Sequence, residues 1–489
     1  MKAFASLLFV LLSHMLIGQE YSTPIFDKGV NINGIETNDN DDIFIVGSTY
    51  RATGTGQDVL VVCLDKDFNL LYDKIYGGEY QDIGFDIAKL NNGNFLISGE
   101  SWRGFNNIWG RENPFYAEID PQGEIISNKS FYLFQHDAAL SAKATSDGNI
   151  LLVGTTRSHQ NNIIEGRIDD ILLLKSDMQG NKIWDYIIPS QGNDYASDFI
   201  EDNGDIVLVG ALGGFFNSNQ ADGRYNHDSQ LLIIRMNDST EIIRNEWGLD
   251  QNDFPAKIIK APDSDDFFVV GSTQSYGEGS YDIVIIRFDN NLNELWHKTI
   301  GGSGFDYGND IALSKDNNSL YILGTHYDTD LSQTQSLLTK MDLNGIIDWR
   351  KQLSIGTITN GKAIALTHDN QIIIAGEYGE SMDSLQLFVS KYNEYGDVKP
   401  IINTQRNLML FPNPIVKGNL LHFRLHSNIK DSIRIEKIDF FTILGEIAQS
   451  SILLDPTTEG SIRVHTNNIS FVRATLTDGS MIWSKIIVY

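Results

Sequence analysis

The feature that most constrains the fold of this chain is an internal repeat. Short apolar runs that end in glycine occur seven times, at Gly47, Gly99, Gly154, Gly210, Gly271, Gly324 and Gly376. Their mean spacing is roughly 55 residues, which is typical of architectures in which each repeat is one small structural unit. Such units bury their apolar faces against their neighbours, so the repeat predicts one continuous array.

A second marker follows each glycine. A polar residue opens a mainly apolar stretch, and Asp or Asn lies seven positions further on: Asp58/Asp65, Asn113/Asp120, Asp170/Asp177, Gln230/Asn237, Asp282/Asp289, Gln335/Asp342 and Gln386/Asn393. Turn-forming clusters such as residues 145–149 and 201–205 separate the runs, and a further strand-like piece, often with Trp, closes each unit. Each unit therefore reads as four antiparallel strands, which we name A to D in chain order.

Seven such units predict an all-β fold in which residues 24–403 form a seven-bladed β-propeller. An extended β-solenoid is the alternative, although its repeats are usually shorter and more uniform. In a propeller, strand A is innermost, and the B–C loops share one face with the D–A turns. We call this the B–C face. The A–B and C–D turns lie on the opposite face.

Residues 1–18 have the pattern of a secretory signal peptide. Lys2 precedes an apolar run over residues 3–17, and the small residue Gly18 favours cleavage before Gln19. A non-cleaved anchor is the alternative. No later segment is long and apolar enough to span a membrane, so we expect an exported protein without a transmembrane segment after cleavage.

Composition excludes several classes of partner and chemistry. The formal net charge is −27, which disfavours nucleic acid because phosphate binding needs a positive surface. Cys63 is the single cysteine, so an intramolecular disulfide and cysteine-based zinc or redox motifs are excluded. No catalytic motif, phosphate loop or metal-binding His pair is present, and the sequence expects no cofactor.

The repeats resemble a known family. The segment 295–328, with its Trp, Gly-Gly and Asp positions, resembles the repeats of secreted β-propellers common in the Bacteroidetes phylum. The resemblance covers about residues 24–403 and is weaker in the third unit. It implies a propeller scaffold and no particular reaction.

Residues 408–489 read as a separate domain, because the periodic markers stop before it. Its short alternating strands predict a small immunoglobulin-like β-sandwich. It resembles the type A sorting domain of type IX secretion substrates through an opening motif, a central turn and a terminal strand, which include Phe411, Pro412, Asn413, Pro414, Gly445 and Lys485. The resemblance implies passage through the periplasm to the cell surface or medium, with the type IX machinery as partner. Residues 467–474 lack the usual Gly-x-Tyr segment, and an adhesive domain without a sorting role is the alternative.

An acid precedes or opens strand A in six units: Asp27, Asp82, Asp137, Asp194, Asp253 and Asp306, with Thr359 in the seventh. These carboxylates are expected to circle the mouth of the central channel. The first interpretation is that each caps a turn by accepting backbone N–H bonds. The alternative is a ring that holds a cation such as calcium, since neighbouring carboxylates repel one another.

The longest B–C loops belong to units 2 to 4, and they are rich in aromatic residues. We expect Trp102, Phe105, Trp109, Phe215, Phe216 and Tyr225 to form a ligand-binding surface, beside Arg103, Arg111, Arg167, Arg224 and His227. Aromatic rings beside polar groups suit sugar or peptide recognition. The alternative is that these rings only pack their own loops.

The sequence thus favours a non-enzymatic protein that binds an extracellular glycan or protein. A glycoside-active enzyme on the same face is the alternative, because carboxylates from different blades can meet there. Asp169, Asp170, Asp222 and Asp228 are the acids to inspect for that role.

Overall fold

The chain divides into two compact units, a large one that ends at Lys399 and a small one from Pro400 to Tyr489. In this computed structural model the described residues of the large unit are 29–50, 56–78, 80–102, 112–133, 136–157, 169–190, 192–213, 229–249, 251–262, 264–328, 332–381 and 385–397. Those of the small unit are its strands, 407–411, 420–426, 435–442, 447–457, 459–463, 469–476 and 481–485.

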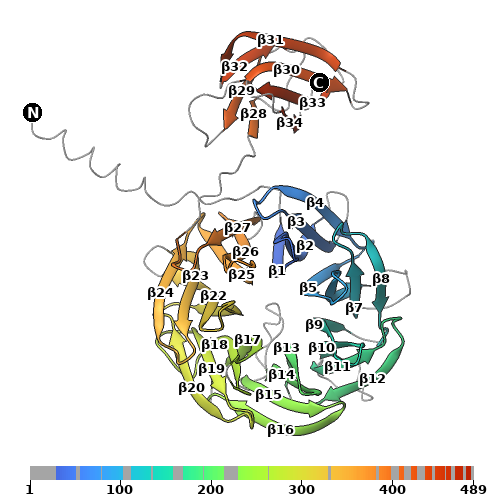
Figure 1. Ribbon diagram of the computed structural model, residues 1–489, viewed down its shortest axis with the longest axis vertical. Coiled ribbons are helices and arrows are strands. Elements are labelled where there is room, and N and C mark those ends of the chain that lie inside the picture. The colour runs from blue at the N-terminus through green and yellow to red at the C-terminus, as the bar shows by residue number, and fades with distance from the viewer. Residues whose placement is uncertain are drawn as a thin grey trace, which may run out of the picture. The chain divides into compact units, whose positions relative to one another are not determined.

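The large unit is an all-β, seven-bladed propeller, with strand A of every blade on the inside of the ring (Figure 1). Blades 1 to 3 comprise β1 (Val30–Thr37), β2 (Ile43–Tyr50), β3 (Gln57–Leu64) and β4 (Leu70–Tyr76); β5 (Asp82–Lys89), β6 (Phe95–Trp102), β7 (Glu112–Ile119) and β8 (Ile125–Ser130); and β9 (Asp137–Ala144), β10 (Ile150–Thr156), β11 (Asp170–Ser176) and β12 (Lys182–Ile188).

Blades 4 to 7 continue the same order around the ring. They comprise β13 (Tyr195–Asp202), β14 (Asp205–Leu212), β15 (Gln230–Asn237) and β16 (Thr240–Trp247); β17 (Asp253–Lys260), β18 (Phe267–Thr273), β19 (Asp282–Phe288) and β20 (Glu294–Ile300); β21 (Asp306–Leu313), β22 (Ser319–Asp328), β23 (Gln333–Asp342) and β24 (Ile347–Leu353); and β25 (Ile358–Leu366), β26 (Ile372–Gly379) and β27 (Gln386–Tyr392). Blade 7 has three strands within the described residues.

The burial of each strand follows from its place in the blade. The middle strands B and C are buried on both faces, as in β10 and β11, because each blade is covered by a neighbour on either side. The outer strand β4 instead alternates between partly buried and exposed residues. The two apolar runs of each repeat are therefore the strands that form the core between blades.

The repeat glycine lies opposite a β-bulge in strand A. In blade 5 the pairing register of β17 shifts between Pro255 and Lys257, opposite Gly271. A Cβ on Gly271 would overlap the Phe254 carbonyl oxygen. The same overlap with a strand A carbonyl recurs at Gly47, Gly99, Gly154, Gly210 and Gly376. The bulge thus explains why every strand B carries a glycine at this step.

The second marker is explained by the C–D turns. Asp289 Oδ1 accepts hydrogen bonds from the backbone N–H groups of Asn291 and Asn293, both at 2.8 Å. The same pair of bonds recurs at Asp120, Asp177, Asp342 and Asn393. In these five blades the Asp or Asn that ends the second run therefore caps the turn that follows strand C.

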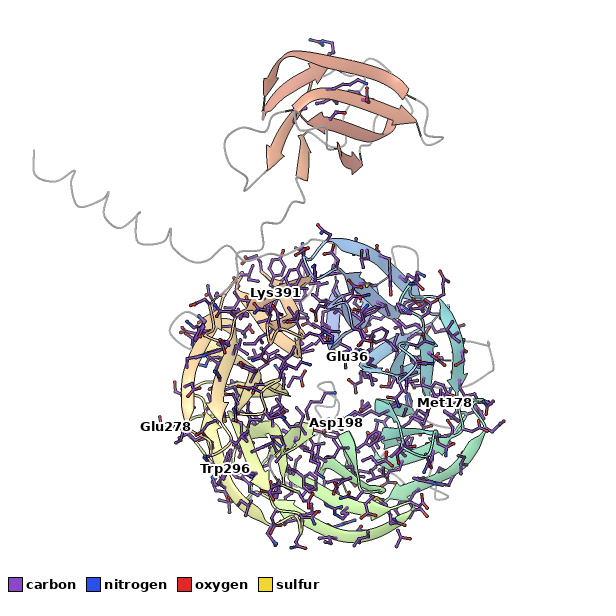
Figure 2. The ribbon with its side chains drawn as sticks, in the orientation of Figure 1. Glu36, Met178, Asp198, Glu278, Trp296 and Lys391 are labelled. Carbon is purple, nitrogen blue, oxygen red and sulfur yellow. The ribbon has the colours of Figure 1, made fainter. Side chains whose placement is uncertain are left out.

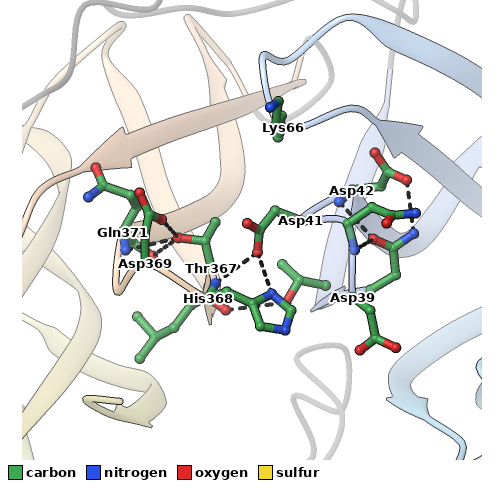
Figure 3. A network of polar contacts seen from close by, with 12 residues as sticks. Asp39, Asp41, Asp42, Lys66, Thr367, His368, Asp369 and Gln371 are labelled. Atoms are coloured by element: carbon green, nitrogen blue, oxygen red, sulfur yellow. Dashed lines mark hydrogen bonds and ion pairs between the residues drawn. The ribbon is translucent and has the colours of Figure 1, made fainter. Parts of the chain in front are cut away.

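The ring closes where blade 7 meets blade 1. The backbone N–H of Ile32 donates to Glu377 Oε1 at 2.7 Å. On the opposite face, Asp41 Oδ1 accepts from the backbone N–H of His368 at 2.8 Å and contacts the His368 ring Nδ1 at 2.9 Å (Figure 3). Residues from the two ends of the propeller sequence thus form one interface.

The small unit contains two antiparallel sheets within its described residues. One has the order β28 (Asn407–Phe411), β29 (Leu420–His426) and β32 (Glu459–Arg463). The other has the order β31 (Ile447–Thr457), β30 (Ile435–Thr442), β33 (Ile469–Leu476) and β34 (Met481–Lys485). Across the part of the chain that the structure describes, no helix is long and apolar enough to cross a membrane.

Candidate functional site

The predicted aromatic surface is represented by one described residue. Trp102 ends strand β6 on the B–C face, and its side chain is 38% exposed. Its ring stacks on Tyr80 with centroids 6.0 Å apart. The other predicted residues, Phe105, Trp109, Phe215, Phe216 and Tyr225, lie outside the described residues.

The described ring acids accept hydrogen bonds from the turns and strands beside them. The side-chain hydroxyls of Ser101, Thr156 and Thr273 donate to Asp82, Asp137 and Asp253, respectively. The backbone N–H groups of Gly78, Gly213 and Gly302 donate to Asp82, Asp194 and Asp306 at 2.7, 2.7 and 2.8 Å. These bonds are the ones that a turn-capping carboxylate makes.

Blade 1 departs from the expected ring. Asp27 lies outside the described residues, and the pairing of β1 with β2 places Val30 opposite Thr49, where blade 2 has Asp82 opposite Ser101. Within the described ranges, no group of three or more His, Cys, Asp or Glu residues is arranged to hold a metal.

Four aromatic side chains gather on the B–C face of blades 5 and 6. We call Phe254, Tyr281, Phe305 and Tyr307 the aromatic cluster. The ring centroid of Tyr281 lies 6.0, 6.2 and 5.4 Å from those of Phe254, Phe305 and Tyr307, respectively. Phe305 and Tyr307 are stacked, with 16° between their ring planes, and they are 46% and 39% exposed. Together these rings offer an accessible aromatic surface.

Neutral amides lie next to this cluster. Asn252 hydrogen-bonds to Tyr281, and its Nδ2 donates to Gln274 Oε1 at 2.8 Å. The backbone carbonyl of Asn252 in turn accepts from the N–H of Gln274 at 2.8 Å. The surface thus combines apolar ring faces with groups that donate and accept hydrogen bonds.

Apolar side chains from several blades pack together next to the cluster. Phe254 and Phe85, from blades 5 and 2, pack against a buried cluster of Ala138, Leu140, Tyr195 and Ala211 from blades 3 and 4. Inner residues of four blades, 2 to 5, thus contribute to one apolar cluster.

Charged residues of the inner strands also meet. Lys257 Nζ of blade 5 lies 2.9 Å from Asp86 Oδ1 of blade 2, which is not a neighbouring blade. Ser141 Oγ lies 2.7 Å from Asp86 Oδ2 and 3.1 Å from Asp198 Oδ1, and Lys143 Nζ lies 2.6 Å from the same Asp198 oxygen. Figure 2 shows Asp198 at the inner edge of the ring.

These contacts set the pKa values of the channel residues. Burial raises the pKa of Asp310 to about 7. Burial opposes ionisation of Asp198 as well, but the charges of Lys143 and Lys257 outweigh it and lower the Asp198 pKa. The pKa of Lys257 is raised, because Asp86 and Asp198 outweigh its burial. The lysines and aspartates of the inner strands therefore form a network of opposite charges.

A second group of ionisable residues lies on the B–C face of blades 2 and 3. Burial, together with the nearby charge of Glu112, raises the pKa of Glu100 to about 7. Glu112 pairs with His136. Burial opposes ionisation of Glu112, but the hydrogen bond and charge of His136, a backbone hydrogen bond and the charge of Arg157 together outweigh burial and lower the Glu112 pKa. Arg157 forms an ion pair with Asp169. Glu100 is thus a carboxyl group that titrates near neutral pH, whereas the pKa of the nearby Glu112 is lowered.

The remaining predicted residues are distributed as follows. Asp169 is engaged by Arg157, and Asp170 opens β11, where it is buried. Asp222 and Asp228 lie outside the described residues, as do Pro412, Asn413, Pro414 and Gly445 of the sorting motif. Phe411 ends β28 and Lys485 ends β34.

The sequence interpretation missed the aromatic cluster and the pair of glutamates. A signal was present, since Phe254, Phe305 and Tyr307 each adjoin a ring acid in sequence. Glu100 directly follows the repeat glycine Gly99, where the other blades mostly have small residues. Attention to the residues flanking the repeat markers would have found both groups.

Comparisons with known proteins identify no family: no family model matches the chain, and no curated protein matches its sequence. Among solved structures, Pyrococcus horikoshii acylaminoacyl peptidase is 11% identical with a TM-score of 0.42, over 84% of this chain and 60% of that one. Sqt1 from Chaetomium thermophilum is 9% identical with a TM-score of 0.44, over 96% and 100% of the two chains. Virginiamycin B lyase from Staphylococcus aureus is 11% identical with a TM-score of 0.32, over 83% and 95%. The chain thus spans about three fifths of the peptidase, and similarities this low carry no inference about activity.

Proposed function

We propose that this protein binds an extracellular glycan on its B–C face and that it does so without catalysis. The observation that carries the proposal is the aromatic cluster, whose Phe305 and Tyr307 rings are stacked and exposed. The C–H faces of a sugar ring pack on aromatic rings, while amides such as those of Asn252 and Gln274 fix its hydroxyl groups. Trp102 lies on the same face, in blade 2, and is a further exposed ring there.

The charge of the chain narrows the class of glycan. A net charge of −27 disfavours uronic acids and sulfated sugars, since an anionic ligand is repelled before it reaches the surface. The polar groups identified beside the rings are neutral amides, which also suit an uncharged sugar. A neutral polysaccharide is therefore the ligand class that we favour over an acidic glycan or a protein.

The test is binding of the purified propeller to a glycan array. The double variant Phe305→Ala/Tyr307→Ala should lose capture of the glycans that the parent binds, while its circular dichroism spectrum stays unchanged. Tyr395→Ala is the matched control, because Tyr395 is 67% exposed in the C–D turn of blade 7, on the opposite face. Equal binding by the double variant and its parent would place the site elsewhere, and capture of protein alone would replace the glycan as ligand.

A glycoside-active enzyme is the second candidate, and the Glu100–Glu112 arrangement favours it. A glycosidase needs one protonated and one ionised carboxyl group, and the opposite pKa shifts of these residues match that requirement. New reducing ends released from a captured glycan by the parent, and not by Glu100→Gln, would establish catalysis. Capture without release would leave binding as the function.

We propose further that the small unit is an immunoglobulin-like sandwich that directs the protein through the type IX machinery to the cell surface or medium. The support is its two antiparallel sheets together with the sequence motifs around Phe411 and Lys485. The signal pattern in residues 1–18 supports the earlier passage into the periplasm.

A further inference from the structure

At alternating interfaces between blades, two buried aspartates face each other. One is the first or second residue of strand C of a blade, and the other is the ring acid that opens strand A of the next blade or directly precedes it. The pairs are Asp58/Asp82, Asp170/Asp194 and Asp282/Asp306, at the interfaces of blades 1/2, 3/4 and 5/6. All six side chains belong to residues that are at most 3% exposed. We call these the aspartate pairs.

The backbone brings the members of a pair together. The N–H of Asp306 donates to the carbonyl oxygen of Tyr281 at 2.8 Å, which places Asp306 beside Asp282. Gly301 passes so close that a Cβ there would overlap Asp282 Oδ1 and lie 2.6 Å from Asp306 Oδ2. Two carboxyl groups thus flank a single glycine.

The other two pairs repeat this arrangement. Gly77 passes beside the first pair, where a Cβ would overlap Asp58 Oδ1 and lie 2.7 Å from Asp82 Oδ2. In the remaining pair the N–H of Asp194 donates to the Asp169 carbonyl oxygen at 2.6 Å, which places Asp194 beside Asp170. The geometry is therefore a property of the blade interface.

The remaining interfaces serve as internal controls. Near its start, strand C there has an amide in place of an acid: Asn113, Gln230, Gln335 or Gln386. The bond from the Asp253 N–H to the Ser229 carbonyl at 2.7 Å shows that Gln230 takes the position of Asp282. The fold thus accommodates a neutral side chain at this step.

Charged or titratable groups act on two of the pairs. His326 Nδ1 lies 2.5 Å from Asp306 Oδ1, while Glu278 adds negative charge near Asp282. Arg244 is the positive group acting on Asp194. Burial and the charge of the partner aspartate raise the pKa of both Asp282 and Asp194 to about 6, although hydrogen bonds to these carboxyl groups act in the opposite direction.

We infer that each aspartate pair binds one proton as the medium becomes mildly acidic, and that this proton locks the two blades together. In the ionised state two buried carboxylates repel each other across the glycine, whereas a shared proton converts the repulsion into a hydrogen bond. An amide at the strand C position is the permanent equivalent of the protonated state.

The pair between blades 5 and 6 acts directly beneath the aromatic cluster. Asp282 follows Tyr281, and Asp306 lies between Phe305 and Tyr307. When the Asp282/Asp306 pair is protonated, it holds the three rings at fixed positions relative to one another. Under the function proposed above, on which this step rests, glycan capture is therefore tighter in mildly acidic medium than at alkaline pH.

The direction of the stability effect follows from linkage. The folded-state pKa of Asp282 lies above its ordinary value, so protonation stabilises the folded protein. This stabilisation is complete below the ordinary pKa of about 4 and is lost as the pH rises through about 6. It is absent at neutral and alkaline pH.

The experiment compares thermal unfolding of the parent, Asp282→Asn, Asp58→Asn and the control Asp73→Asn between about pH 5 and pH 8. Asp73 is an exposed residue of the outer strand β4. At pH 8 the two pair variants should melt about 2 °C or more above the parent, and this gain should shrink toward zero at pH 5. The melting temperature of the control Asp73→Asn should match that of the parent at both pH values.

The reverse substitution adds a pair. Asn113→Asp places an acid opposite Asp137, and it should lower the melting temperature at pH 8 while leaving it unchanged at pH 5. If Asp282→Asn and Asp58→Asn raise the melting temperature equally at pH 5 and pH 8, or do not raise it at all, the aspartates do not share a proton. These measurements use no ligand, so their outcome is independent of whether the aromatic cluster binds a glycan.

Discussion

Lys257 shows how one side chain can join blades that do not touch as sheets. Its ammonium group lies 2.9 Å from Asp86 across the channel and also lowers the pKa of Asp198. A buried ion pair is weak evidence for stability, since desolvation offsets much of its attraction. Removing one member of the pair nevertheless lowers the stability of the folded protein, because the charge of the other member stays buried without its partner.

The first prediction follows from that asymmetry. Lys257→Met should lower the free energy of unfolding by about 3–5 kcal/mol at neutral pH, measured by urea denaturation. The double variant Lys257→Met/Asp86→Asn should recover most of the loss, because no unpaired carboxylate remains at position 86. Lys298→Met, on the exposed side of β20, is the control and should change stability by less than about 0.5 kcal/mol. A loss no larger than that of the control would show that the bridge carries no structural role.

Among the strands, the pairing of a bulge with a glycine recurs throughout the ring. The bulge in strand A turns a carbonyl oxygen toward strand B, and only a residue without a Cβ leaves room for it. Gly271→Ala should therefore lower the free energy of unfolding by about 1–3 kcal/mol, since the backbone of β17 must shift.

Gly302→Ala is the matched control for that variant, because no atom lies within 4 Å of the added Cβ. It should be neutral within about 0.5 kcal/mol in the same denaturation assay. If both variants lose the same amount, the effect belongs to glycine's flexibility and not to the bulge.

This local rule explains how much the sequence could predict. The bulge and the C–D turn each act within one blade. A glycine equivalent to Gly271 and an Asp or Asn equivalent to Asp289 therefore recur in the sequence of every repeat and give the number of blades. The aromatic cluster instead joins Phe254, Tyr281 and Phe305. These residues come from separate segments of the chain and lie together only once the blades have packed. In blade 1 the pairing register places Val30 at the step where blades 2 to 6 have a ring acid, and Asp27 lies outside the described residues. The loop residues expected to bind ligand lie outside the described residues and stay a prediction.

At the scale of the whole chain, the two units make different contributions. If residues 408–489 serve only as a sorting signal, deleting them should leave a folded propeller whose melting temperature differs little from that of the full chain. The shortened protein should accumulate in the periplasm, as measured by cell fractionation and calorimetry. A large fall in the melting temperature would make the small unit part of the propeller's stability, and undiminished release would contradict a sorting role.

The closure of the ring has a consequence for the order in which the chain is made. Ile32 and its partner Glu377 are separated by 345 positions. Synthesis runs from the N-terminus, so β1 is complete long before β26 and β27 have left the ribosome. Until then the face of blade 1 that will pack against blade 7 is an uncovered apolar surface. Unfinished chains associate through surfaces of this kind. A chain that stops short of blade 7 has six stacked sheets and no ring, and we expect such fragments to need a chaperone that complete molecules do not.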